Sequence, residues 1–189
     1  MKRGFKAQAE RTAISVRQEL GLGEMDALCP WKYAKHLGIE MLDFDKLGLS
    51  EANQNQLITK DPKSWSGMTL RLGEVTGIVL NPKHSIARQK STLMHELAHF
   101  SLKHVPARVE VSASKLMLLS DYSDEQETEA DWLGFTMLLP RELLYQLRKD
   151  GKSAKQIAKE LQISEDVCTY RLRMTGVDIQ LKNAARKST

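Results

Sequence analysis

The sequence has few cysteines and no long hydrophobic run. Cys29 and Cys168 lie far apart and belong to no C-x-x-C pair, as is typical of two free thiols in a reducing compartment. No apolar run approaches the roughly 18 residues that a membrane span requires. Residues 1–8 lead into an amphipathic polar helix, which excludes the apolar core of a signal peptide. We therefore expect a cytoplasmic protein with no membrane association.

The composition indicates a soluble globular protein with a basic C-terminal end. The chain has 189 residues, of which 41% are hydrophobic, so it can bury a core of ordinary size. Residues 141–189 contain 11 Lys and Arg against 6 Asp and Glu, a net charge of +5, whereas residues 1–140 contain 17 against 18. This shift predicts one compact domain followed by a basic appendage.

The most informative motif is His95-Glu96-Leu97-Ala98-His99. On a helix, residues four apart lie on one face, so His95 and His99 can direct imidazole nitrogens at a single metal ion, with Glu96 beside it. A zinc ion with three protein ligands keeps one position open, lowers the pKa of the water bound there to about 7 and polarises a carbonyl group. Since Glu96 can take the proton of that water, the motif is that of a Zn²⁺ site with its own general base.

The segment around this motif has the pattern of a buried helix. Its apolar residues leave little polar surface: Leu93, Met94, Leu97, Ala98, Phe100 and Leu102. Two histidines and a glutamate in such a helix need polar partners. The alternative to a metal site is an ordinary core helix whose histidines are satisfied by hydrogen bonds. A third ligand from a separate element would favour the metal site.

Residues 121–139 predict a second helix that can supply this ligand. Ser123 is a suitable N-cap, acidic residues fill the first turn, and Pro140 ends the helix. Asp131 would lie one turn beyond the 127 position, where a carboxylate can accept the second ring N–H of a ligating histidine. Helical periodicity separates the three competing ligands only partly: Glu125, Glu127 and Glu129.

In these segments the chain resembles the ImmA/IrrE family of zinc metallo-endopeptidases. Residues 77–82 and 88–100 are similar to the strand and the active-site helix of that family. Residues 127–140 are similar to its third-ligand helix, in which a Glu stands three residues before an Ala-Asn or Ala-Asp pair. The chain departs from the pattern at Ser91, where an aromatic residue is common, and at Ala98, where Gly is usual.

The resemblance implies an α+β, zincin-like metallopeptidase fold and a zinc-dependent endopeptidase activity. Its alignment selects Glu127 as the third ligand beside His95 and His99, with Glu96 as the general base. It also implies that the substrate is one cognate protein, typically a helix-turn-helix transcriptional repressor linked to a mobile element, a toxin-antitoxin pair or a stress response.

Periodicity and Gly or Pro boundaries predict the remaining elements of the first domain. One strand of the predicted hairpin could bind an extended substrate along its edge, as the resemblance also implies, or the hairpin could be only structural. The predicted elements are helices over 5–20 and 30–36, a strand over 39–42, an irregular stretch over 44–64, and a hairpin with strands over 66–72 and 77–80.

The basic C-terminal segment has the pattern of a helix-turn-helix. Ile157 and Leu161 would pack inward, and Arg171 and Arg173 would lie on the second helix. We favour a packing or partner-docking role over direct nucleic-acid binding, because two arginines offer few phosphate contacts. The predicted organisation is a zincin-like domain over residues 1–145, a helix-turn-helix-like segment over 146–178 and a disordered tail over 179–189.

Two further questions stay open at the level of sequence. His104 follows His99 by five residues, and we interpret it as an exposed histidine that interacts with the dipole of the helix end. Tyr122 and Arg88 are possible donors to a transition-state oxyanion. The rival functional hypothesis is a non-catalytic zinc-fold module that binds a repressor or DNA, and Glu96 argues against it because a pure binder needs no base.

Overall fold

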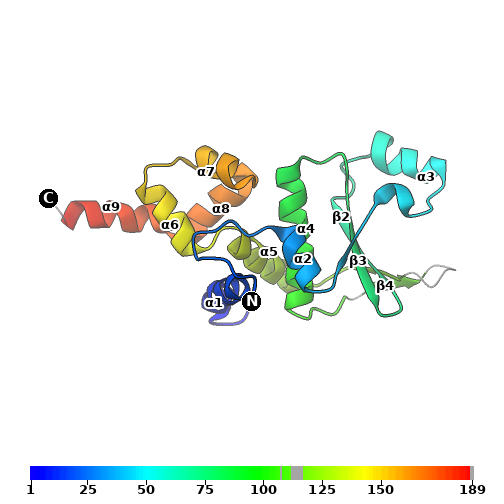
Figure 1. Ribbon diagram of the computed structural model, residues 1–189, viewed down its shortest axis with the longest axis horizontal. Helices are drawn as coiled ribbons and strands as arrows, with labels where there is room; N and C mark the ends of the chain where they lie inside the picture. The colour runs from blue at the N-terminus through cyan, green and yellow to red at the C-terminus, as the bar shows by residue number, and fades with distance from the viewer. Residues whose placement is uncertain (107, 112–116, 188–189) are drawn as a thin grey trace.

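The computed structural model describes residues 1–106, 108–111 and 117–187 as a mixed α+β structure (Figure 1). The sheet lies towards one end of the elongated molecule and the C-terminal helices form the other end. The helices are α1 (Phe5–Glu19), α2 (Pro30–His36), α3 (Glu51–Asn55), α4 (Ile86–Ser101), α5 (Asp124–Leu138), α6 (Arg141–Lys149), α7 (Ala154–Leu161), α8 (Glu165–Thr175) and α9 (Val177–Lys187). The strands are β1 (Glu40–Leu42), β2 (Gly67–Leu72), β3 (Val75–Leu80), β4 (Arg108–Val111) and β5 (Met117–Ser120).

The five strands form one sheet in the order β1-β3-β2-β5-β4. The predicted hairpin is confirmed: β2 and β3 pair antiparallel around a turn in which Gly73 has a φ of 60°. β1 pairs with β3 over residues 77–79 and β5 pairs with β2 over residues 69–71, so whether a strand of this hairpin binds a peptide stays a prediction. Gly67 and Met68 of β2 pair with β3 but have no partner in the described part of β5.

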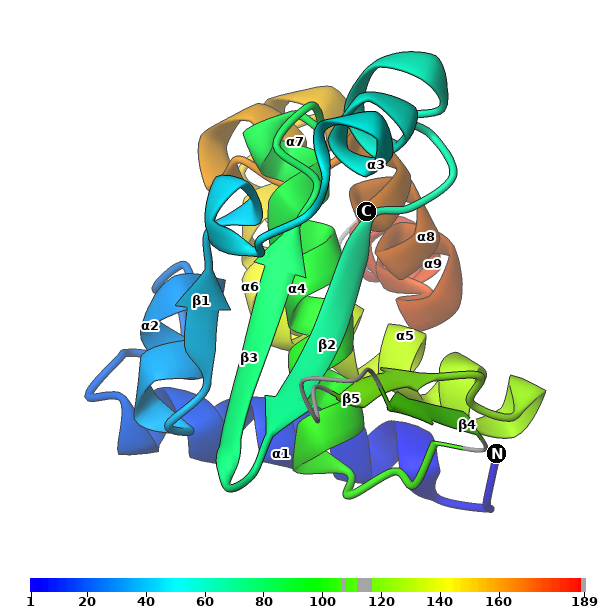
Figure 2. The ribbon, with the colours of Figure 1, turned by 90° about the vertical axis from the view of Figure 1, so that its right-hand side faces the viewer.

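Helix α4 packs against the sheet on one side and against α5 on the other (Figure 2). The two helices approach closely at Gly134, where an added Cβ would lie 3.0 Å from the backbone oxygen of Met94. The α4 face at this contact is fully buried at Leu93, Met94 and Leu97. This packing brings the first turn of α5 over the C-terminal half of α4, where the site lies.

Residues 44–64 contain regular structure, so the prediction of an irregular stretch is wrong. Ser50 caps α3 by accepting a hydrogen bond from the Asn53 backbone N–H, and a single turn of π-helix over Gln56–Lys60 follows. Trp65 fixes this turn by donating from its indole N–H to the Leu57 carbonyl. A small second core supports the segment and consists of Phe44, Trp65, Leu70 and Val79.

The C-terminal segment consists of short helices that share the main core. Ser153 and Ser164 cap α7 and α8, and Gln162 ends α7 in the left-handed conformation. Arg171 of α8 is 0% exposed, pairs with Glu10 of α1 and donates to the Leu139 carbonyl. Whether the segment acts as a helix-turn-helix stays a prediction. So does the boundary after residue 145, although buried side chains on both sides of it belong to one core.

The tail from residue 179 is helical as far as Lys187, so the prediction of disorder is wrong over this stretch. Val177 anchors the start of α9 because its side chain is fully buried. Arg148 of α6 holds the same turn through an ion pair with Asp178, 2.8 Å long. Tertiary contacts with α6 therefore order residues whose polar sequence alone indicated fraying.

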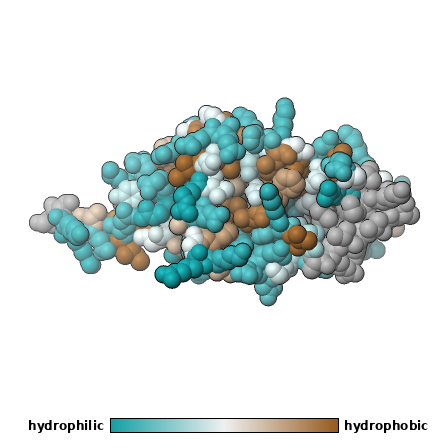
Figure 3. Space-filling view, turned by 90° about the horizontal axis from the view of Figure 1, so that it is seen from below, coloured by the Kyte–Doolittle hydropathy of each residue, from teal (hydrophilic) through white to brown (hydrophobic). Residues whose placement is uncertain are grey.

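The face of the molecule in Figure 3 is mostly hydrophilic, with hydrophobic residues in small separate groups. Within the described ranges, no helix combines the length and the apolar character needed to cross a membrane.

Candidate metal centre

His95 and His99 project from the same side of α4. Their Nε2 atoms lie 3.0 Å apart, because one helical turn separates the two residues. Two nitrogen lone pairs at this distance repel each other unless a proton or a cation lies between them. The spacing in the sequence thus produces the pair of imidazoles that it predicted, and this pair suits a cation.

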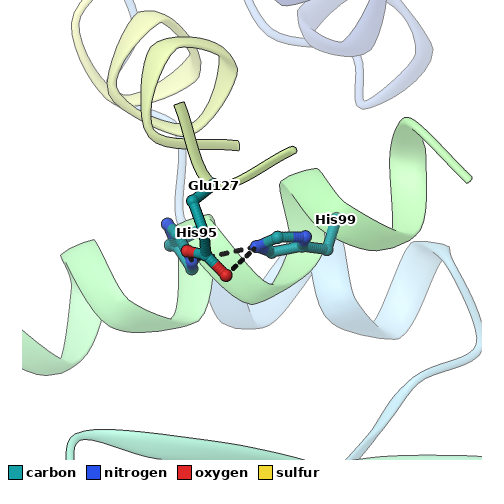
Figure 4. Close-up of side chains that lie close together, drawn as sticks. All are labelled: His95, His99 and Glu127. Atoms are coloured by element: carbon teal, nitrogen blue, oxygen red, sulfur yellow. Dashed lines mark hydrogen bonds and ion pairs between the residues drawn. The ribbon is translucent and has the colours of Figure 1, made fainter. Parts of the chain in front are cut away.

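Glu127 completes a group of three ligand atoms. Its carboxylate oxygens lie 3.1 Å from His95 Nε2 and 3.7 Å from His99 Nε2, and Figure 4 shows the three side chains pointing toward one another. One ligand atom from each residue lies within 4.8 Å of the others. A capping box of Ser123 and Gln126 begins α5 and presents Glu127 at the end of its first turn. Two imidazoles and a carboxylate fit a divalent cation such as Zn²⁺.

The other two acidic candidates on α5 have different partners. Glu125 pairs with the N-terminal amine of Met1. Glu129 lies 3.5 Å from His104 Nε2, and only 14% of its side chain is exposed. The structure therefore separates Glu127 from its neighbours, which periodicity alone did not do.

Asp131 contacts the ring nitrogen of His95 that faces away from the group. Its carboxylate lies 2.9 Å from His95 Nδ1, so it accepts the N–H of the tautomer whose Nε2 is free for a metal. The i+4 relation between Glu127 and Asp131 places both carboxylates on the face of α5 that meets α4.

Burial and nearby charges shift the pKa values of the two histidines in opposite directions. Burial favours a lower pKa for His95, but the hydrogen bond to Asp131 and the carboxylate charges of Glu96, Asp131 and Glu127 outweigh it and raise the pKa. Burial, followed by the charges of His95 and His104, lowers the pKa of His99 to about 3. His99 is thus neutral near pH 7, which is the form that binds a metal ion.

Glu96 lies beside the group, between α4 and the sheet. Thr69 of β2 donates its hydroxyl to a Glu96 carboxylate oxygen at 2.6 Å. Burial raises the pKa of Glu96, and the Thr69 hydrogen bond and the charge of His95 offset part of this rise. A carboxylate with a raised pKa beside a metal-ligand group is suited to accept and return a proton.

The interpretation of His104 as an exposed helix-end residue is wrong. Only 7% of its side chain is exposed, and its Nδ1 lies 3.0 Å from His99 Nδ1. The five-residue spacing from His99 was the signal in the sequence, but it becomes informative only if the chain turns back sharply after α4.

Tyr122 and Arg88 occupy different sides of the site. The Tyr122 ring stacks on the His99 ring with centroids 3.8 Å apart. Burial and the charges of Glu96 and Glu127 raise the pKa of Tyr122 to about 12, which keeps its hydroxyl protonated. Arg88 instead donates to the Ser66 hydroxyl and lies about two helical turns before His95. Tyr122 is therefore the better placed of the two to donate near the group.

Two cavities meet at Glu96. The first, of about 560 Å³, extends toward α8 and includes Asp166 and Tyr170 in its wall. The second, of about 520 Å³, extends past His99 toward Phe100 and Lys103. Since Glu96 lines both, a ligand could continue across the site from one cavity into the other. The α8 wall was not expected from the sequence, because no local pattern relates residues 166 and 170 to residue 96.

The fold and the site together define a protein of the metallopeptidase class. A sequence model of the IrrE N-terminal-like domain, a peptidase family, matches residues 57–173, and the chain belongs to this family. The matched range includes the three residues of the metal-ligand group, Glu96 and the α8 wall. No curated protein matches the chain.

Proposed function

We propose that this protein is a zinc-dependent endopeptidase that cleaves one specific cytoplasmic protein. The observation that carries the proposal is the group of His95, His99 and Glu127 with the buried carboxylate of Glu96 next to it. A non-catalytic metal site has no chemical need for such a base. Membership of a metallopeptidase family supports the same conclusion.

The donor set favours zinc over other cations. Two imidazole nitrogens and one carboxylate are the ligands of many catalytic zinc sites, which keep a fourth position open. When bound, zinc would supply Lewis acidity to the attacking water and to the peptide carbonyl. Asp131 would hold the His95 ring in the required tautomer, since its carboxylate accepts from Nδ1.

Glu96 would move the proton in both halves of the reaction. As a carboxylate it accepts a proton from the attacking water, and it then donates that proton to the nitrogen of the leaving amine. Its raised pKa makes the second transfer easier, because the protonated form is less costly in the buried site. The Thr69 hydrogen bond orients the carboxylate while this happens, and Tyr122 would donate to the developing oxyanion.

The two cavities support an extended peptide as the substrate. A peptide that crosses Glu96 would place side chains in both cavities, with its backbone beside the open edge of Gly67 and Met68. We further propose that the substrate is a helix-turn-helix repressor, as the family resemblance implies, so that cleavage would regulate a mobile element, a toxin-antitoxin pair or a stress response. Direct nucleic-acid binding by this chain is disfavoured, because the buried Arg171 cannot contact phosphate.

The metal content of purified protein tests the site. Elemental mass spectrometry after dialysis against zinc should give about one zinc per chain for the wild type and a clear loss for Glu127→Ala. Glu125→Ala is the matched control, because it removes an acidic side chain from the same turn of α5 outside the group. Circular dichroism should show that all three proteins are folded. Folded wild type that takes up no zinc would overturn the proposal.

The chemistry is tested with the repressor encoded nearest to the gene for this protein. Wild type with zinc should cleave it at one site, whereas Glu96→Gln should bind zinc and the repressor without cleaving. Tight binding by wild type with no cleavage would instead favour the regulatory module. Full activity of Glu96→Gln would remove Glu96 from the mechanism.

A further inference from the structure

The end of α4 is built so that it places His104 against His99. Leu102 caps the helix, and Lys103 follows in the left-handed conformation with a φ of 55°. The Lys103 N–H donates to the Phe100 carbonyl and the His104 N–H donates to the His99 carbonyl, both at 3.0 Å. These two bonds define a Schellman motif, in which the residue after the left-handed one packs on the last turn of the helix.

The side chains of His99, His104 and Glu129 form a line of contacts that leads away from the metal-ligand group. His99 Nδ1 lies 3.0 Å from His104 Nδ1, and His104 Nε2 lies 3.5 Å from a carboxylate oxygen of Glu129. All three side chains are largely buried, with 3%, 7% and 14% of their surfaces exposed. Side chains so enclosed must satisfy their polar atoms mainly through one another.

A metal ion on His99 and the carboxylate of Glu129 together determine which atom donates in each of these hydrogen bonds. If His99 Nε2 binds a metal ion, its proton must be on Nδ1, which then donates to His104 Nδ1. The proton of His104 must therefore be on Nε2, which faces an acceptor-only carboxylate at Glu129. In the opposite direction His104 Nδ1 would donate to His99 Nδ1, and the proton of His99 would then lie on the metal-binding nitrogen.

We propose that His104 and Glu129 are positioning residues that hold His99 in its metal-binding tautomer and orientation. The inference rests on the metal site of the proposed function and extends it. The two histidine ligands are then supported in parallel: Asp131 acts on His95 directly, and Glu129 acts on His99 through His104. The alternating carboxylates of α5 thus contact three different ring nitrogens around one site: Glu127 lies against His95 Nε2, Asp131 against His95 Nδ1 and Glu129 against His104 Nε2.

A pair of substitutions separates the two contacts of His104. In His104→Asn the side-chain oxygen can replace Nδ1 as the acceptor from His99, but the side chain is too short to reach Glu129. In His104→Gln the amide reaches the place of Nε2 near Glu129, but it offers nothing at the Nδ1 position. His104→Ala removes both contacts. His36→Ala is the control, because its histidine is 40% exposed and pairs with Glu19 outside the site.

Zinc affinity, measured by competition with a chromogenic chelator, is the first readout. We expect His104→Ala and His104→Gln to lose 10- to 100-fold in affinity, the range typical of residues that orient a ligand. His104→Asn should recover part of this loss, Glu129→Ala should lose less than His104→Ala, and the control should not change. Wild-type affinity in His104→Ala would overturn the proposal.

The second readout is the tautomer of His99 in metal-free protein, from long-range ¹⁵N–¹H spectra of the imidazoles. Wild type and His36→Ala should show the proton on Nδ1, whereas His104→Ala should show a mixture of tautomers. An unchanged Nδ1–H pattern in His104→Ala would overturn the proposed role of His104 and Glu129. This readout tests the role of His104 and Glu129 even if the wild type binds no zinc. The absence of zinc binding would by itself overturn the proposed function.

Discussion

In the metal-free protein, the negative charge of the buried Glu96 lowers the free energy of unfolding. Burial raises its pKa, so the protonated form is the one that the fold favours. A group with a raised pKa contributes stability below its ordinary pKa, and this contribution is lost as the pH rises through the raised value. The part of the stability that depends on Glu96 should therefore fall as the pH rises from the ordinary pKa of a glutamate through the raised one.

We expect Glu96→Gln to be more stable than wild type at pH 7–8 when both are free of metal, because the amide needs no ionisation. The difference should shrink as the pH falls and disappear below the ordinary pKa of a glutamate. Urea unfolding in the presence of a chelator, repeated over this pH range, measures it. Glu40→Gln, at an exposed position of β1, controls for the loss of one carboxylate. A pH-independent difference would contradict the assignment.

The backbone conformation of Lys103 also lowers the free energy of unfolding. Its φ of 55° is in the left-handed region, which glycine adopts without strain. Lys103→Gly should raise the free energy of unfolding by about 0.5–1 kcal/mol, after the extra freedom of glycine in the unfolded chain is included. Lys159→Gly, at an exposed position inside α7, should lower it by about 1 kcal/mol. Chemical denaturation of the three proteins checks both signs, and destabilisation by Lys103→Gly would contradict the strain argument.

Residues whose geometry is set within one helix were predictable from the sequence. The pairing of His95 with His99 follows from helical periodicity alone. Glu127 could be separated from Glu129 only by family resemblance, since the choice depends on where α5 crosses α4. His104 was misread because the chain turns back at a lysine, so the glycine that usually marks a Schellman motif is missing.

At the scale of elements, the contact between α4 and α5 decides how accurately the ligands meet. Gly134 lets the backbones approach, and an alanine there would bring its Cβ within 3.0 Å of the Met94 oxygen and 3.3 Å of the His95 nitrogen. Both atoms are backbone atoms of a buried helix, so neither can move without moving α4. Glycine, whose side chain is a hydrogen atom, fits this contact without displacing either helix.

Gly134→Ala should therefore destabilise the protein by about 1–2 kcal/mol, because the clash exceeds the gain of about 1 kcal/mol in helix propensity. It should also weaken zinc binding about tenfold, since Glu127 and Asp131 would move away from His95. Gly23→Ala is the control, because its new Cβ would meet only the Asp26 side chain at an ordinary 3.4 Å. Thermal unfolding and chelator competition measure the two effects, and wild-type zinc affinity in Gly134→Ala would show that the helices tolerate the shift.

The elements themselves were predicted where local signals are strong. The hairpin of β2 and β3 and the helix over Pro30–His36 lie where turn and capping residues placed them. The parallel pairing of β1 with β3 and the addition of β5 to β2 depend on residues far apart in the sequence, and no local pattern encodes them. The helical turns over residues 44–60 depend on Trp65 and the small core around it, a tertiary effect of the same kind.

For the whole molecule, the question is whether the C-terminal helices are an appendage or a part of the fold. Arg171 is fully buried and connects α8 to α1 and to the end of α5. The same helix lines the first cavity at Asp166 and Tyr170. The basic composition of this segment indicated an interaction surface, whereas its burial pattern and the lining of the first cavity indicate that it completes both the core and that cavity.

A chain that ends at residue 145 should not fold. It would lack eight buried side chains of the main core: Leu147, Ile157, Ala158, Leu161, Ile163, Val167, Cys168 and Val177. Burial of each large aliphatic side chain contributes about 1.5–3 kcal/mol, so their combined loss is comparable with the total stability of a domain, about 5–15 kcal/mol. Glu10 would also lose its ion pair with the buried Arg171.

We expect the shortened chain to bind a hydrophobic dye, to unfold without a cooperative transition and to hold no zinc. A chain that ends at residue 181 is the control, because it keeps all eight side chains and removes the exposed end of α9; it should unfold like the full chain. Cooperative unfolding and zinc binding by residues 1–145 would instead establish the C-terminal helices as a separate domain. In that case the cleft wall at Asp166 and Tyr170 would be a docked module, and its removal should change substrate choice while leaving the metal centre intact.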